Sequence, residues 1–153
     1  MQTRLNAFQA APDLMKAVLA LSEAVKASGI ETALKELVKI RASQINGCAF
    51  CLEMHTTEAR ALGETEERIY LLSGWRESPL YTERERAALG WTEAVTLLAD
   101  THAPDDVYAE ARQQFNDQEL TELTVAIGLI NLWNRIQVGF RAIHPVKKKK
   151  AAA

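Results

Sequence analysis

Residues 44–55 read QINGCAFCLEMH, and this stretch holds both cysteines of the 153-residue chain together with His55. Asn-Gly at positions 46 and 47 is a turn signal, so we expect one helix to end there and another to begin at about Cys48. In that second helix Cys48, Cys51 and His55 follow each other at intervals of three and four residues, which places their side chains on one face. The stretch therefore predicts a helical hairpin that carries a redox or metal site.

The two thiols are expected to be activated in different ways. Cys48 lies at the predicted helix N-terminus, where the positive end of the helix dipole and free N–H groups favour a thiolate. Cys51 lies four residues before His55, whose imidazole can act as its base. Glu36 belongs to the preceding predicted helix, residues 31–45, and the rise per residue brings it nearly level with His55 across the turn. A carboxylate at that height would orient the imidazole and stabilise its charged form.

Four residues on these two predicted helices form a longer pattern. Glu36, Cys48, Cys51 and His55 stand at the spacing Glu-x11-Cys-x-x-Cys-x3-His. With this pattern the chain resembles the alkylhydroperoxidase D-like (AhpD-like) proteins of the carboxymuconolactone decarboxylase superfamily. Cys-x-x-Cys alone would be a weak signal, whereas four residues at three fixed spacings are a specific match.

The resemblance extends over most of the chain, because WTEAV at residues 91–95 and INLWNR at residues 130–135 are similar to later segments of that family. It implies an all-helical fold, trimers or hexamers, and a cysteine pair that reduces hydroperoxides or partner disulfides. One position differs. The best-known members carry a second histidine between the two cysteines, where this chain has Phe50.

The resemblance also implies a role for each site residue. Cys51 would be the thiolate that attacks a hydroperoxide or a disulfide, and Cys48 would resolve the product as a Cys48–Cys51 bond. His55 would be the general base and Glu36 would orient it. The residues alone leave the order of attack open, because the helix N-terminus favours Cys48 and the histidine favours Cys51. No flavin or nicotinamide motif is visible, so we expect no cofactor and an external thiol or dithiol reductant, either a protein or a lipoyl-type group.

Composition favours a single cytoplasmic domain. The chain is 48% hydrophobic, which is enough for a sizeable core, and we expect one domain over residues 1–146 followed by a flexible Lys/Ala tail at residues 147–153. A net charge of −2 predicts no nucleic-acid or membrane partner. Neither a signal peptide nor a membrane span is expected, so the two cysteines would meet a reducing cytoplasm.

The spacing of apolar residues predicts an all-α bundle of about six to seven helices, with the Cys-x-x-Cys at the start of one of them. The expected helices cover residues 12–26, 31–45, 48–62, 65–72, 82–101, 104–115 and 118–142. The last is apolar on almost every face, as expected for a helix buried at the centre or between subunits, and it favours a homo-oligomer. Arg135 interrupts it, and we expect this charge to pair with a carboxylate across the core or an interface.

Two further expectations concern charged residues around the hairpin. Lys35 and Lys39 are expected to face water, and Glu93 in the family-like WTEAV segment is a candidate carboxylate beside the site.

Three other functions compete with the thiol-dependent antioxidant enzyme. Cys48, Cys51, His55 and possibly Glu36 have the ligand types of a zinc site, although three ligands on one helix face crowd a tetrahedron. A decarboxylase acting on a lactone ring is disfavoured, because relatives with that activity generally lack the cysteine pair. A redox-responsive interaction protein would oxidise the pair without meaningful turnover.

Overall fold

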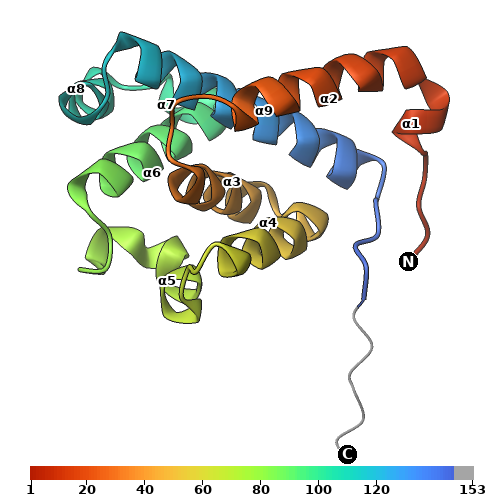
Figure 1. The fold of residues 1–153 in the computed structure, drawn as a ribbon, viewed down its shortest axis with the longest axis horizontal. Helices are drawn as coiled ribbons and strands as arrows, with labels where there is room; N and C mark the ends of the chain where they lie inside the picture. The colour runs from red at the N-terminus through yellow and green to blue at the C-terminus, as the bar shows by residue number, and fades with distance from the viewer. Residues whose placement is uncertain (147–153) are drawn as a thin grey trace, which may run out of the picture.

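The computed structural model of the chain describes residues 1–146, and that part contains helices and turns but no strand (Figure 1). The predicted all-α class is confirmed. The tail predicted at residues 147–153 lies outside the described residues. The helices are α1 (Ala7–Ala10), α2 (Pro12–Lys26), α3 (Thr32–Asn46), α4 (Ala49–Ala61), α5 (Glu66–Leu71), the 3-10 helix η1 (Leu72–Glu77), α6 (Glu83–Thr96), α7 (Leu98–Thr101), α8 (Asp105–Gln114) and α9 (Asp117–Gly139).

Nine α-helices occur among residues 1–146, where the sequence predicted about six to seven. The difference comes mainly from α1 and α7, which are four residues long. Helix α1 forms because the Asn6 side chain accepts hydrogen bonds from the N–H groups of Phe8 and Gln9. Helix α7 is separate because the predicted helix over residues 82–101 is interrupted at Leu97, where φ is −95° and ψ is 34°.

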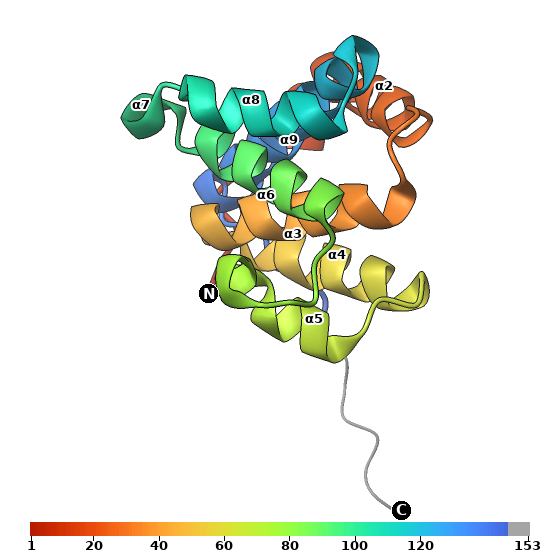
Figure 2. The ribbon, with the colours of Figure 1, turned by 90° about the vertical axis from the view of Figure 1, so that its left-hand side faces the viewer.

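Helix α3 lies at the centre of the fold and packs against α4, α6 and α9 (Figure 1). In Figure 2, α6, α3 and α4 are stacked one below another, and α8 packs on the far side of α6. Leu37, Val38 and Ile40 of α3 are fully buried. Val38 joins a cluster with α6, α8 and α9, while Leu37 and Ile40 join one with α4 and η1. The residues that α3 contributes to the site therefore stand on a helix that is held on several sides.

The prediction that Lys35 faces water is wrong. Its side chain is buried, and its ammonium group donates to the backbone carbonyls of Val25 at 3.3 Å, Lys26 at 2.7 Å and Ser28 at 3.3 Å. The last carbonyls of α2 have no partner within their own helix, and this lysine supplies one. Burial is the largest cause of the lowered pKa of Lys35.

Helix α9 spans 23 residues and turns its buried face toward α3 and α6. It leaves Val125, Leu132 and Val138 exposed on its other side. Across the described part of the chain, no helix combines the length and the apolar character that a bilayer crossing requires.

Candidate functional site

The turn between α3 and α4 sets the position of both cysteines. Gly47 ends α3 in the left-handed conformation, with φ at 65°, which glycine adopts without steric cost. The next N–H, that of Cys48, donates to the carbonyl of Ser43 at 3.0 Å. Cys48 is the N-cap of α4, and its sulfur accepts a hydrogen bond from the N–H of Cys51 at 3.4 Å. The prediction that the Cys-x-x-Cys begins a helix is confirmed.

The two sulfurs lie together in the interior. Both cysteines are free, both are 1% exposed, and their Sγ atoms are 2.6 Å apart. The hydrogen bond from the Cys51 thiol is the largest cause that lowers the pKa of Cys48 from 9.0 to about 6; burial opposes it and the Cys51 N–H adds to it. The same hydrogen bond, with burial, raises the pKa of Cys51. The negative charge of the reduced pair therefore belongs on Cys48 and the proton on Cys51.

His55 and Glu36 meet across the helical hairpin, as the sequence predicted. The imidazole Nδ1 lies 2.9 Å from Oε2 of Glu36, and both side chains are buried. The other carboxylate oxygen of Glu36, Oε1, accepts from Lys39 Nζ at 2.7 Å, so Lys39 is a partner of the site and does not simply face water. Burial acts to raise the pKa of Glu36, but the hydrogen bonds from His55 and Lys39 outweigh it and lower the pKa.

Glu58 is a second carboxylate that contacts the same imidazole nitrogen, and the sequence did not predict it as part of the site. Its Oε2 lies 3.1 Å from His55 Nδ1, and its side chain is 52% exposed. The i, i+3 spacing of the two residues on α4 was a signal for this contact. A carboxylate can only accept, so Nδ1 carries the hydrogen and Nε2 remains for proton exchange elsewhere. The imidazole thus has one buried and one solvent-facing carboxylate.

A metal could be held here only by part of the predicted ligand set. In residues 1–146, the group of side chains with suitable ligand atoms comprises Glu36, His55 and Glu58, whose atoms lie within 4.8 Å of one another. Neither cysteine belongs to it, so the zinc site of two sulfurs, His55 and Glu36 is not assembled. The Lys39 ammonium on Glu36 also repels a cation.

The sulfurs face apolar side chains on one side and polar side chains on the other. Cys48 and Cys51 pack with Ile130, and the partly buried Phe50 and Trp133 complete this cluster. Phe50 thus brings an aromatic ring where the best-known relatives have histidine. On the polar side, the carbonyl of Ser43 accepts the N–H of Cys48, and Asn134 donates to the Ser43 hydroxyl at 3.0 Å; both residues act to lower the pKa of Cys51. The sequence predicted neither residue as part of the site. For Asn134, its polar side chain in the otherwise apolar α9 was a signal.

Arg135 and Glu93 have other partners than those predicted. Arg135 is exposed and donates to the carbonyl of Asn131 at 2.9 Å and to its Oδ1 at 3.1 Å. It forms no ion pair in the described range, so the predicted pair across the core is wrong, and pairing across an interface stays a prediction. Glu93 accepts from Arg41 at 2.7 Å, from Trp75 at 2.9 Å and from Arg76, and so ties α6 to α3 and η1 instead of contacting His55.

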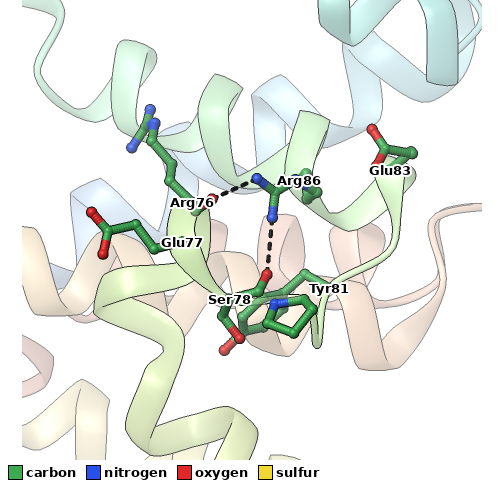
Figure 3. A pocket seen from close by; sticks show the side chains of 7 residues that line it. Arg76, Glu77, Ser78, Tyr81, Glu83 and Arg86 are labelled. Carbon is green, nitrogen blue, oxygen red and sulfur yellow. Dashed lines mark hydrogen bonds between the residues drawn. The ribbon is translucent and has the colours of Figure 1, made fainter.

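A shallow pocket of about 410 Å³ lies between η1 and the start of α6, and none of the cysteine-site residues lines it (Figure 3). Arg86 in this pocket donates to the carbonyls of Arg76 at 2.7 Å and Ser78 at 3.1 Å. Its guanidinium thereby satisfies backbone carbonyls at the end of η1.

Known proteins resemble this chain in sequence and in fold. Residues 12–94 match the Carboxymuconolactone decarboxylase family. A protein of unknown function from Agrobacterium tumefaciens, for which an antioxidant defence role as AhpD has been suggested, is 55% identical, with a TM-score of 0.93 over 95% of this chain and 100% of that one. The uncharacterised YdfG of Bacillus subtilis is 41% identical over 90% of this chain and 94% of its own. An uncharacterised peroxidase-related protein from Ralstonia eutropha, described as an AhpD core, shares the fold at 18% identity, with a TM-score of 0.78 over 91% and 74% of the two chains.

Proposed function

The chain belongs to the carboxymuconolactone decarboxylase family, and we propose that it is a thiol-dependent antioxidant enzyme that reduces hydroperoxides, or a disulfide of a partner protein, through Cys48 and Cys51. The observation that carries this proposal is the buried pair of sulfurs 2.6 Å apart, with the pKa of Cys48 lowered to about 6. A thiolate at neutral pH beside a thiol is what the reduction of a peroxide needs.

The first chemical step oxidises Cys48. Its thiolate attacks the terminal oxygen of the hydroperoxide, an S–O bond forms, and the O–O bond breaks. The alkoxide takes a proton from the His55 imidazolium and leaves as the alcohol, and Cys48 becomes a sulfenic acid. This order reverses the one that the resemblance implies, because the hydrogen bonds leave the proton on Cys51 and the charge on Cys48.

The second step forms the disulfide. His55 takes the proton of Cys51, the new thiolate attacks the sulfenic sulfur, and hydroxide leaves with that proton as water. Glu36 and Glu58 hold the imidazole and stabilise its charged form in both steps. An external dithiol then attacks the Cys48–Cys51 bond and is itself oxidised to a disulfide. One of its two protons goes to Cys51 and the other to the His55 imidazole, which restores the thiolate, the thiol and the imidazolium.

The working form is proposed to be a cytoplasmic homo-oligomer, a trimer or hexamer, with a protein or lipoyl-type dithiol as reductant. Leu14 and Leu19 on α2 and Val125 and Leu132 on α9 are large apolar side chains exposed in a single chain, which supports burial between subunits. Light scattering that shows a monomer at micromolar concentration would contradict the oligomer.

The test is hydroperoxide consumption with a dithiol donor by wild type, Cys48→Ser and Cys51→Ser. We expect both variants to lose turnover, and Cys51→Ser to accumulate a sulfenic acid on Cys48 that dimedone traps. His55→Ala should lower turnover because it removes the proposed proton donor and acceptor. His144→Ala, which removes another histidine of the chain, is its matched control and should keep full turnover. Turnover at the wild-type rate by Cys48→Ser would refute the proposed chemistry.

A redox-responsive interaction protein is the alternative, favoured by the burial of both sulfurs, each 1% exposed. It would form the Cys48–Cys51 disulfide once and show no sustained consumption of hydroperoxide when the dithiol is regenerated. Counting turnovers per chain separates the two functions.

A further inference from the structure

Three asparagine side chains link α3 and α9 beside the cysteine pair. Asn46 donates from Nδ2 to Oδ1 of Asn131 at 2.9 Å and to Oδ1 of Asn134 at 2.8 Å. Asn134 in turn donates from Nδ2 to the hydroxyl of Ser43 at 3.0 Å. Asn134 and Ser43 are fully buried. The hydrogen-bonded amides therefore lead from the surface of α9 to the interior where the sulfurs lie.

The partners of Asn131 decide which way its amide faces. The oxygen and nitrogen of an amide have nearly the same shape, so their assignment must follow from what they contact. Nη1 of Arg135 can only donate, and it lies 3.1 Å from Oδ1 of Asn131. The carbonyl oxygen of Ile127 can only accept, and it lies 2.9 Å from Nδ2 of Asn131. The atom that Asn131 turns to Asn46 is therefore its oxygen, and the facing atom of Asn46 is its nitrogen.

The orientation of the Asn46 amide also fixes that of Asn134. Because Asn46 donates, the atom of Asn134 that faces it must be Oδ1, and Nδ2 must point the other way, toward Ser43 and the sulfurs. Nδ2 carries two hydrogens, and one goes to the Ser43 hydroxyl. The second is available to the cysteines, because the same Ser43 also accepts the N–H of Cys48 with its carbonyl at 3.0 Å, and Asn134 acts to lower the pKa of both Cys48 and Cys51.

We propose that Asn134 is a thiolate-binding residue whose amide N–H stabilises the negative charge on the reacting sulfur, and that Asn46 and Asn131 are positioning residues that hold this N–H toward it. The inference rests on the proposed function in that the thiolate it stabilises is the proposed nucleophile. The thiol proton of Cys51, which stabilises the same charge in the resting pair, is given up when the disulfide forms. The Asn134 N–H stays in place, so it can also stabilise whichever sulfur leaves when the reductant opens the disulfide.

Charged groups stand on all three helices that pack around this pair, and they must stay constant in the test. They are Glu36 and Lys39 on α3, His55 and Glu58 on α4, and Arg135 on α9. Variants that change only the asparagines leave these groups in place. A shift of the thiol titration in Asn134→Leu or Asn46→Leu then reports on the amides, because neither substitution adds a charge.

The experiment measures the ultraviolet absorbance of the thiolate against pH for the reduced full chain. Asn134→Leu removes the donor at similar size, and we expect its titration midpoint to rise by about 1 to 2 pH units. Asn134→Asp replaces the donor with an acceptor and should raise the midpoint further. Asn46→Leu touches neither sulfur but frees the Asn134 amide to turn, so it should raise the midpoint by a smaller amount.

The matched control is Asn116→Asp, the same substitution at the N-cap of the same helix, where aspartate caps as well as asparagine. Its midpoint should equal that of wild type. Midpoints in the Asn134 variants equal to wild type would overturn the inference, and an unmoved midpoint in Asn46→Leu would overturn the positioning roles. If both Asn134 variants fail to fold, Asn46→Leu alone decides. A wild type with a low midpoint that consumes no hydroperoxide would refute the proposed function and leave this inference standing.

Discussion

Replacing Cys51 with alanine should raise the pKa of Cys48, because it removes the group that lowers this pKa most. In the wild type the Cys51 sulfur lies 2.6 Å from the Cys48 sulfur, and the pKa of Cys48 is lowered from 9.0 to about 6. The backbone N–H of Cys51, 3.4 Å from the same sulfur, survives the substitution. We therefore expect a partial return of the pKa toward its ordinary value.

The size of the effect follows from the lost hydrogen bond. A hydrogen bond to a charged group contributes about 1.5 to 3 kcal/mol, and one pKa unit corresponds to about 1.4 kcal/mol, so the pKa should rise by about 1 to 2 units. Near pH 7 the thiolate fraction would then fall from roughly 90% to between about 50% and 10%. A thiolate of higher pKa is also the better nucleophile, with a Brønsted coefficient of about 0.4 to 0.5, and this gain roughly cancels the loss of thiolate. The rate at one pH is thus a poor observable, whereas the midpoint moves clearly.

The assay is the iodoacetamide alkylation rate of Cys48 across the pH range, with the modified residue identified by peptide mass spectrometry. Cys51→Ser is the matched control, because its hydroxyl keeps a donor of similar size next to Cys48. We expect its midpoint to lie between those of the wild type and Cys51→Ala. A wild-type midpoint near the ordinary 9.0, or an alanine variant that titrates like wild type, would refute the assignment of the proton to Cys51.

Three other predictions follow from the site and the core. The folded-state pKa of Cys48 lies below its ordinary value, so the Cys48 thiolate stabilises the fold above pH 9.0, and this stabilisation is lost as the pH falls through about 6. Urea midpoints of the reduced wild type should fall over that pH range. An equal pH dependence in Cys48→Ser would contradict the prediction. His55→Ala and Glu36→Ala should each raise the pH midpoint of thiol alkylation, because the charge of His55 lowers the pKa of Cys48. Fully additive shifts in the double variant would mean that the carboxylate acts independently of the imidazole. Leu37→Ala should cost about 2 to 5 kcal/mol of unfolding free energy because Leu37 is fully buried in α3, whereas Leu98→Ala at the exposed start of α7 should cost less than about 0.5 kcal/mol; denaturant titrations compare them.

The helices were predictable because each depends on neighbours in the sequence. The Thr82 and Glu85 side chains form a capping box at the start of α6, where the predicted helix over residues 82–101 begins, and Gly47 ends α3 where the Asn-Gly turn signal placed the break. Lys35 was not predictable in this way. Its position on α3 looked solvent-facing, but the carbonyls that it binds belong to the end of α2, and only the packing of the two helices brings them within 2.7 to 3.3 Å.

The same distinction separates the predicted part of the site from the rest. Glu36 and His55 could be matched across the turn because two helices of known rise, joined by a short turn, have a calculable register. Asn134 lies 91 residues from its partner Ser43, and no local rule relates the two positions. Glu58 was within reach of a local rule, since it follows His55 by three residues, but an exposed glutamate at that spacing is ordinarily only a solvated side chain.

The order of attack was open in the sequence because two activating groups were assigned to two different thiols. In the structure the sulfurs are 2.6 Å apart and share one proton, so a positive group near either one acts on the single charge of the pair. The charge of His55 accordingly lowers the pKa of Cys48, although Cys51 is its neighbour along the helix. What decides between the sulfurs is the set of donors aimed at each. Cys48 accepts the N–H of Cys51, and the lowered pKa of Cys48 with the raised pKa of Cys51 leaves the shared thiol proton on Cys51. A donor that belongs to the second cysteine can stabilise a thiolate only on the first.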